Sequence, residues 1–291
     1  MNKLLTVFLL LLRKITRCFY KIRGTARIAD GIRRHFSSLS VDVMINDFDG
    51  TLKFYCELGG HMGSYIFWKG YYSSEQLVYL NTILKPDTVF VDIGANHGEF
   101  TLFAAKRARE GQVYSFEPSS KVFSRLVRNI SLNGFDSRVR AFNLGLGESS
   151  GVRQLYTDTS KFRDNTFHEG LSNLYKPEGE HIVSENIRVA SLDEVYNDNN
   201  LLKPSIIKID VEGAELAVLK GSRSVITRFK PVIIMEVDAG NCKASGCTQK
   251  ELTDTIISMG YKCSLITAKG TISEFDPSRA TEFQNIVCFP R

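Results

Sequence analysis

The sequence has few of the features that mark membrane-spanning, disulfide-linked or zinc-binding proteins. Its longest mostly apolar run, from Leu4 to Leu12, would form a helix about 14 Å long, whereas a bilayer core is roughly 30 Å thick. The six cysteines have no regular spacing, and only Cys242 and Cys247 lie close together. This pattern predicts reduced thiols and neither a disulfide scaffold nor a zinc site. The sequence also contains no internal repeats and no low-complexity tract.

The net charge of +5 is unevenly distributed along the 291 residues. Residues 1–36 contain nine Lys or Arg and a single acid, Asp30, so the rest of the chain has a formal net charge of −3. A body that is mildly acidic lacks the basic face that phosphate backbones require. We therefore expect no nucleic-acid partner, and we assign the basic residues to an N-terminal arm. The oligomeric state does not follow from the sequence.

The arm, residues 1–36, has two interpretations that both fit its pattern. It is either an anchor that lies in the plane of a membrane surface, with Leu and Phe in the interface and Lys and Arg at anionic headgroups, or a helix that packs on the body or on a partner. Arg13-Lys14 stands where a cleaved signal would have small residues. We expect a cytoplasmic protein, and any anchored form would sit on the cytoplasmic membrane face. A lipid-linked glycan would then be a suitable acceptor.

Beyond the arm, the sequence predicts a lead-in segment and one large α/β domain. Residues 37–88 combine short mixed patterns with a helix near 74–84, and residues 89–291 alternate apolar strands with amphipathic helices. Such alternation is typical of a parallel, doubly wound sheet. The last two strands, near 261–267 and 285–289, have no helix between them and suggest an antiparallel closure. We predict a Rossmann-like, seven-stranded, mostly parallel sheet with an antiparallel last strand and a polar insert at about 148–187.

The turn after the first strand of this domain indicates which cofactor the sheet binds. The segment VFVDIGANHGEFT places Asp92 at the end of the strand and Gly94, Ala95 and Asn96 in the turn, where the backbone can approach a ligand. A dinucleotide fingerprint would need glycine where Asn96 and Glu99 stand. Glu99 at the start of the helix would repel a pyrophosphate. S-adenosylmethionine (SAM) has no phosphate and carries a positive sulfonium, so it is the expected cofactor.

Three further positions complete the expected cofactor site. Glu117 ends the second strand, directly before Pro118, where a carboxylate can accept both hydroxyls of a ribose. Asn143 and Gly145 follow the third strand, where polar groups would face an adenine. For Asp92 and Glu117 the alternatives are an acid that only braces its own turn and a helix-capping acid, respectively.

The segment IIKIDVEGAE carries the second group of functional residues. Lys208, Asp210 and Glu212 share one face of a strand by period-two alternation, although a central parallel strand is normally apolar on both faces. Pairing of Lys208 with an acid would offset the cost of burial. Asp210, Glu212 and the nearby Glu236 are the candidate catalytic residues, because clustered carboxylates raise a pKa and create a general base. A metal site is the less favoured alternative, and we assign no metal ligands.

In the order and spacing of six segments, the sequence resembles the FkbM-type SAM-dependent methyltransferases. The segments are VFVDIGANHGEFT, VYSFEP, NISLNG, LGLGESSG, IKIDVEGAELAVLKG and KPVIIMEVD. The resemblance covers about residues 60–290. It implies a class I methyltransferase fold and O-methylation of a hydroxyl on a small-molecule or glycan acceptor. By position, Asp92, Gly94, Asn96 and Glu117 would bind SAM, whereas His97 and Glu99 depart from the family pattern.

The predicted function is therefore SAM-dependent O-methylation, with Tyr156, Asn165, His168 and Tyr175 of the insert as an acceptor lid. A surface loop without a function is the alternative for the insert. Two rival functions are a nicotinamide-dependent oxidoreductase, which would need the missing glycine fingerprint, and a non-catalytic Rossmann-like scaffold at a membrane surface.

Overall fold

The structure, a computed structural model, describes residues 3–22, 24–39, 41–160, 162, 164, 166–167, 172–175, 181–277 and 281–291. The chain forms two compact units. The first consists of Met1–Tyr72, Thr157–Leu171 and Gly179–Val183, and the second of Ser73–Tyr156, Ser172–Glu178 and Ser184–Arg291.

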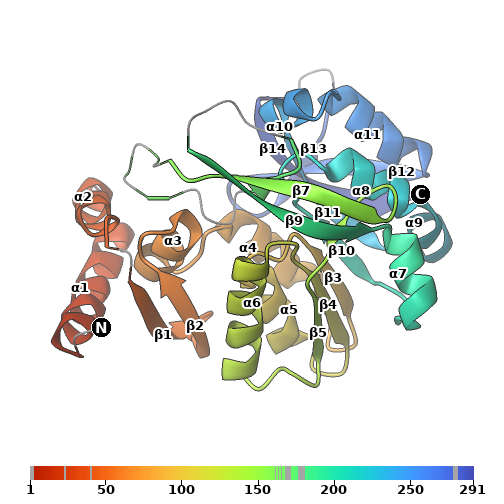
Figure 1. Ribbon diagram of the computed structural model, residues 1–291. Helices are drawn as coiled ribbons and strands as arrows, with labels where there is room; N and C mark the ends of the chain where they lie inside the picture. Colours follow the sequence, from red (N-terminus) through yellow and green to blue (C-terminus); the bar gives the residue numbers. More distant parts are fainter. Residues whose placement is uncertain are drawn as a thin grey trace. The chain divides into compact units, whose positions relative to one another are not determined.

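The first unit contains two helices in the arm, and a hairpin and a third helix in the lead-in segment, where the sequence predicted only short mixed patterns (Figure 1). Its elements are α1 (Lys3–Lys21), α2 (Ala26–Phe36), β1 (Asp42–Phe48), β2 (Leu52–Glu57) and α3 (His61–Lys69). Strands β1 and β2 pair antiparallel, and α1 packs on α2 and α3. No helix in the described part of the chain combines the length and the apolar character needed to span a bilayer.

Arginine side chains, rather than aliphatic ones alone, fix α1 inside this unit. Arg13 is buried; its Nε donates to the Phe67 carbonyl (2.5 Å) and its Nη1 lies 2.8 Å from Asp47 Oδ2. Arg17 reaches the same oxygen at 2.9 Å. Arg33 of α2 is buried as well and lies 2.8 Å from Asp164 Oδ2. Much of the basic arm is therefore used for internal ion pairs.

The second unit is built on an eight-stranded sheet in the order β13-β12-β14-β11-β10-β3-β4-β5. Strands β5, β4, β3, β10 and β11 are mutually parallel, and β14 pairs antiparallel with both β11 and β12. The strands are β3 (Val89–Ile93), β4 (Gln112–Phe116), β5 (Val139–Phe142), β10 (Ile206–Ile209), β11 (Val232–Asp238), β12 (Tyr261–Ile266), β13 (Ile272–Glu274) and β14 (Phe283–Pro290). This confirms the predicted fold class, with β13 as one additional edge strand.

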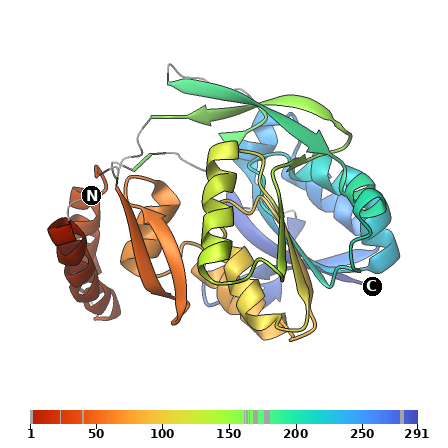
Figure 2. The same ribbon diagram turned by 60° about the horizontal axis from the view of Figure 1, so that its bottom comes forward.

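Helices cover both faces of this sheet, as the alternating pattern predicted. They are α4 (Ser74–Ile83), α5 (Glu99–Arg107), α6 (Ser120–Leu132), α7 (Leu192–Asn199), α8 (Glu215–Gly221), α9 (Arg223–Phe229), α10 (Ala239–Ala244) and α11 (Gln249–Ser258). In Figure 2, the yellow helix α6 and the teal α7 and α8 lie on opposite sides of the parallel strands. One core cluster joins α7, α8, α9 and α11 to a single face of the sheet, on which Ile207 and Ile209 of β10 lie. The intervening Lys208 therefore points to the other face, toward α5.

Two local features of the second unit go beyond the strand–helix alternation that the sequence predicts. The helical segment after β10 is divided into α8 and α9 at Ser222. The chain packs closely there, because a Cβ on Gly221 would lie 2.0 Å from the Gly147 carbonyl oxygen. The polar insert is also not a plain loop. Its strands β7 (Gly151–Asp158), β8 (Ser172–Asn173) and β9 (Ile182–Ala190) form a four-stranded sheet with β6 (Gly145–Leu146).

Candidate active site

The candidate site lies at the carboxyl ends of the parallel strands. Asp92 is in β3 and Glu117 follows β4, while Asp210 follows β10 and Glu236 is in β11. In the sheet register Asp92 stands beside both Lys208 and Ser115. Neighbours in register project to the same face, so strand order alone brings these side chains together. The edge is the one at which open α/β sheets bind their ligands.

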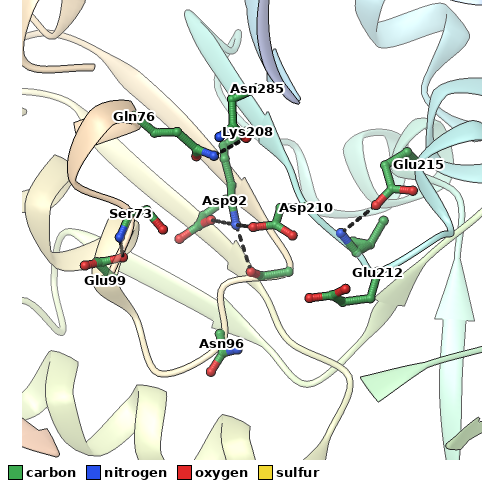
Figure 3. A network of polar contacts seen from close by, with 12 residues as sticks. Ser73, Gln76, Asp92, Asn96, Glu99, Lys208, Asp210, Glu212, Glu215 and Asn285 are labelled. Atoms are coloured by element: carbon green, nitrogen blue, oxygen red, sulfur yellow. Dashed lines mark hydrogen bonds and ion pairs between the residues drawn. The ribbon is translucent and has the colours of Figure 1, made fainter. Parts of the chain in front are cut away.

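Lys208 is the centre of a charged network that joins the carboxyl ends of β3 and β10 (Figure 3). Its ammonium group lies 3.2 Å from Asp210 Oδ2 and 3.7 Å from Asp92 Oδ1, and it donates to the Gly94 carbonyl at 3.1 Å. Burial alone would lower the pKa of Lys208, but Asp210 and Asp92 outweigh burial and raise it. The side chain therefore remains a cation. The expected pairing of Lys208 with an acid is confirmed.

Asp92 is fully buried between a hydroxyl and this ammonium. Its Oδ2 accepts a hydrogen bond from Thr101 (2.6 Å), whose hydroxyl also lies 2.8 Å from Ser115 Oγ. Burial raises the pKa of Asp92, and Lys208 and Thr101 only partly oppose this effect. The carboxylate thus contacts side chains from α5 and β10, and its role toward a cofactor stays a prediction.

Glu117 connects the first two loops of the sheet. Its Oε2 accepts the backbone N–H of Asn96 (3.0 Å) and its Oε1 accepts that of Ser119 (2.9 Å). Burial raises the pKa of Glu117 to about 7, against the lowering effect of these two N–H groups. Each carboxylate oxygen retains a second lone pair, so the group can accept further hydrogen bonds from a ligand.

The turn after β3 is shaped by close packing against the end of β10. Gly94 has φ +77°, and a Cβ there would lie 1.8 Å from the Asp210 carbonyl oxygen, so no other residue fits. The amides of Gly94 and Ala95 donate to the Phe116 carbonyl, and Asn96 adopts φ +49°. The turn residues therefore hold β3, β4 and β10 together at the point where a ligand would approach.

His97, one of the two residues that depart from the family pattern, lies in an environment that does not suit proton transfer. Its ring is buried, and neither ring nitrogen has a hydrogen-bond partner among the described residues. Burial, followed by the charges of Arg125 and Lys121, lowers the pKa of His97 to about 3. The ring is neutral at physiological pH and is no source of protons for a reaction.

The residues that follow β5 serve two different parts of the second unit. Asn143 donates to the carbonyls of Glu117 and Pro118 (3.0 and 2.9 Å), so it braces the loop that carries Glu117. Gly145 is buried in β6, where it pairs with Val189 of β9. The structure thus brings Asn143 and Pro118 to Glu117 and places Gly145 in the second sheet.

An excess of carboxylates surrounds the single cation Lys208. Burial, and then the negative charge of Asp210, raise the pKa of Glu212 to about 8 and that of Glu236 to about 10. Glu212 has φ +52°, a strained conformation for a non-glycine residue, and its Oε2 accepts a hydrogen bond from Asn241 (3.0 Å). Glu215 accepts the amides of Val211 and Gly213, as expected of an acid in the first turn. No group of three or more possible metal ligands occurs among the described residues.

Several residues of the site were not identified from the sequence. Gln76 of α4 donates to Asn285 of β14, which stands beside Glu236 in the sheet register. Glu99 turns toward α4 and accepts the amide of Ser73 (3.0 Å). Gln76 and Asn285 are 209 positions apart, so no local pattern links them. Thr101 was detectable, since a hydroxyl one helical turn into α5 can reach a strand acid.

The expected lid is only partly described. Tyr156 donates to Gln154 Oε1 on β7, and the amide of Tyr175 donates to Asn173 Oδ1. Asn165 and His168 lie outside the described residues. The lid function therefore stays a prediction.

Comparison with known proteins identifies relatives of the second unit. The family model described as Methyltransferase FkbM domain matches residues 92–263. The AMB antimetabolite synthetase AmbE of Pseudomonas aeruginosa is 29% identical over 212 residues, which cover 63% of this chain and 10% of AmbE. The hexuronic acid methyltransferase AglP of Haloferax volcanii is 32% identical over 156 residues, 54% of this chain and 58% of AglP.

A third relative is the 31-O-demethyl-FK506 methyltransferase FkbM of Streptomyces tacrolimicus, with 29% identity over 164 residues. That match covers 47% of this chain and 60% of the relative. The chain thus spans about three fifths or less of the length of these curated relatives.

Proposed function

This chain belongs to the FkbM methyltransferase family, and from that premise we propose that it transfers a methyl group from SAM to a hydroxyl oxygen of a sugar or another small molecule. The carrying observation is the excess of buried and partly buried carboxylates around Lys208 at the ligand-binding edge of a class I methyltransferase sheet. When bound, SAM supplies an electrophilic methyl group on a positively charged sulfur.

The residues at this edge fit SAM better than they fit a nucleotide with phosphates. Glu117 offers a buried carboxylate for the two ribose hydroxyls, with Asn143 and Pro118 supporting its loop. Asp92, Gly94, Ala95 and Asn96 form the turn beside it. The buried Glu99 occupies the first turn of α5, so no free helix N-terminus is offered to a phosphate. Gly145 lies in β6 and has no side chain, so it would contact the cofactor only through its backbone.

Glu212 is the proposed proton acceptor for the acceptor hydroxyl. Its pKa of about 8 is close to the value at which a base is efficient near neutral pH, and Asn241 fixes one of its oxygens. Asp210, held by Lys208, orients the hydroxyl, and burial and the charges of Asp210 and Glu212 raise the pKa of Glu236 to about 10, so Glu236 stays protonated near neutral pH. A cationic sulfonium beside these acids would favour their charged forms. Much of the remaining rate enhancement would come from positioning the hydroxyl.

The acidic surroundings also favour a hydroxyl over a carboxylate as the methyl acceptor. A carboxylate acceptor needs no base and would be repelled by Asp210, Glu212 and Glu236. A neutral hydroxyl needs both the base and the orientation that these acids supply. Sugars are the favoured class because they offer neutral hydroxyls, and the body charge of −3 disfavours nucleic acid.

The test combines cofactor binding with methyl transfer on the full chain. We expect micromolar SAM binding by calorimetry, weakened at least about tenfold in Glu117→Gln because a charge-assisted bond to the ribose is lost. Glu110→Gln, an exposed acid outside the site, is the matched control and should bind like the original protein. Methyl transfer from labelled SAM to a panel of sugars should fall by about 10²–10⁴ in Glu212→Gln while SAM binding persists.

Each outcome separates the proposal from its rival. Absence of SAM binding by the folded protein would refute the methyltransferase function and favour the scaffold. SAM binding without transfer that depends on Glu212 would retain the cofactor site and remove Glu212 as the base.

A further inference from the structure

Helix α1 exposes an apolar stripe to solvent. The stripe consists of Leu4, Val7, Phe8, Leu11 and Ile15, whose side chains are 50–77% exposed. Their spacing of three and four residues places all five on one side of the helix, and Ile22, directly after the helix, is 54% exposed as well. Ile28 on α2 is 55% exposed as well. Among the described residues, no other helix has so many large exposed apolar side chains.

The arrangement of this helix is the reverse of that in an ordinary surface helix. In such a helix the aliphatic side faces the core and the cations face water. In α1 the buried side holds Arg13 and Thr16 beside Leu9, and Arg13 and Arg17 are bound to Asp47. The helix is therefore fixed in its unit through charges, and its aliphatic side is exposed. An exposed apolar surface of this extent marks an interaction site.

The charge around the stripe indicates what covers it. Helix α1 contains no acid, and the one acid of residues 1–36, Asp30, lies near Lys69 and Arg33. Among the described side chains of the arm, Lys14 of α1 and Arg27 and Arg34 of α2 are exposed cations that can meet an external partner. Two copies of such a helix would repel each other, because no acid is available to pair with these cations. An anionic lipid surface accepts both the aliphatic side chains and the cations.

We propose that α1 lies in the plane of an anionic membrane surface, with its apolar stripe in the interface and Lys14, Arg27 and Arg34 at the headgroups. At about 1.5 Å per residue, its 19 residues would lie along roughly 28 Å of the surface. This inference concerns the first unit only, so it holds or fails independently of the proposed methyl transfer.

The test is co-sedimentation of the full chain with vesicles of phosphatidylcholine, with and without phosphatidylserine. We expect binding to the anionic vesicles that is at least about tenfold tighter than to pure phosphatidylcholine and that weakens with salt. Leu11→Asp/Ile15→Asp should reduce binding about tenfold or more, because two aliphatic side chains no longer enter the interface. Lys14→Gln/Arg27→Gln/Arg34→Gln should reduce binding to the anionic vesicles only.

The matched control is Val152→Asp/Leu202→Asp, two aliphatic side chains of the second unit that are 63% and 56% exposed. It should bind vesicles like the original chain. Trp68 fluorescence and circular dichroism would verify that each variant is folded. Failure of the original chain to sediment, equal binding by the stripe variant, or a stripe-dependent dimer in light scattering without vesicle binding would each overturn the proposal.

Discussion

The two units of this chain bury cations against carboxylates in opposite proportions. In the first unit Arg13 and Arg17 share the single acid Asp47, and Arg33 lies beside Asp164 and Asp30. In the second unit Lys208, the one buried cation among the described residues there, faces Asp92 and Asp210, and the charge of Asp210 also acts on Glu212 and Glu236. Cations match or outnumber acids in the buried clusters of the first unit, and acids outnumber the cation in the cluster around Lys208.

The pKa values follow this proportion. Although burial opposes it, hydrogen bonds and charges from the arginines lower the pKa of Asp47, and similar contacts lower that of Asp164 to about 2. In the second unit burial and neighbouring acids raise the pKa of Glu212 to about 8. Acids that are paired with enough cations stay charged and stabilise the fold. Acids that outnumber the neighbouring cations retain protons near neutral pH, and a reaction can use these protons. The difference teaches that the ratio of charges, rather than burial alone, separates a structural cluster from a chemical one.

The largest expected effect comes from removing Lys208, the one buried cation among the described residues of the second unit. Lys208→Met leaves Asp92 and Asp210 without a counter-charge and removes the bond to the Gly94 carbonyl. We expect a loss of about 3–5 kcal/mol in the free energy of unfolding at pH 8, measured by urea denaturation, together with loss of methyl transfer. Adding Asp210→Asn should recover part of the stability but not the activity. Unchanged stability of Lys208→Met would show that the acids are protonated at this pH.

The sequence predicted the second unit much better than the first, for a physical reason. The strand–helix alternation and the segments around Asp92, Glu117 and Asp210 are local patterns, so the sheet, its active edge and the pairing of Lys208 were predictable. The contacts that fix the first unit are distant in sequence: Arg33 and Asp164 are 131 positions apart. No sequence periodicity predicts such pairs. The sequence therefore showed that the arm is basic and apolar, but not which of its cations are buried. The structure assigns its buried cations to the protein and leaves its aliphatic side exposed.

A smaller effect is expected from breaking a pair in the first unit. Arg33→Met removes the guanidinium contact to Asp164 Oδ2, whereas the amide and the hydroxyl of Thr166 still donate to Oδ1. We expect a loss of about 2–3 kcal/mol in the stability of that unit. Trp68 is the only tryptophan of the chain and lies buried in α3, so its fluorescence reports the first unit selectively. Circular dichroism, dominated by the larger second unit, should show a smaller change. Asp164→Asn serves as the matched variant, because it removes the charge and keeps the shape.

The smallest effect, and the sharpest comparison, is the response of each unit to pH. Asp164 has a lowered pKa, so it stabilises the first unit above its ordinary value of 3.8, and this contribution is lost as the pH falls toward about 2. Glu212 has a raised pKa, so the folded second unit holds a proton that the unfolded chain releases above 4.5. The stability of the second unit should therefore decrease, by on the order of 2 kcal/mol, as the pH rises from about 5 to about 8. Urea unfolding followed by Trp68 fluorescence should show no such decrease for the first unit over this range, and Glu212→Gln should flatten the slope seen by circular dichroism. Parallel slopes for the two signals would mean that the charge ratio does not distinguish the units, and that burial alone sets their titration.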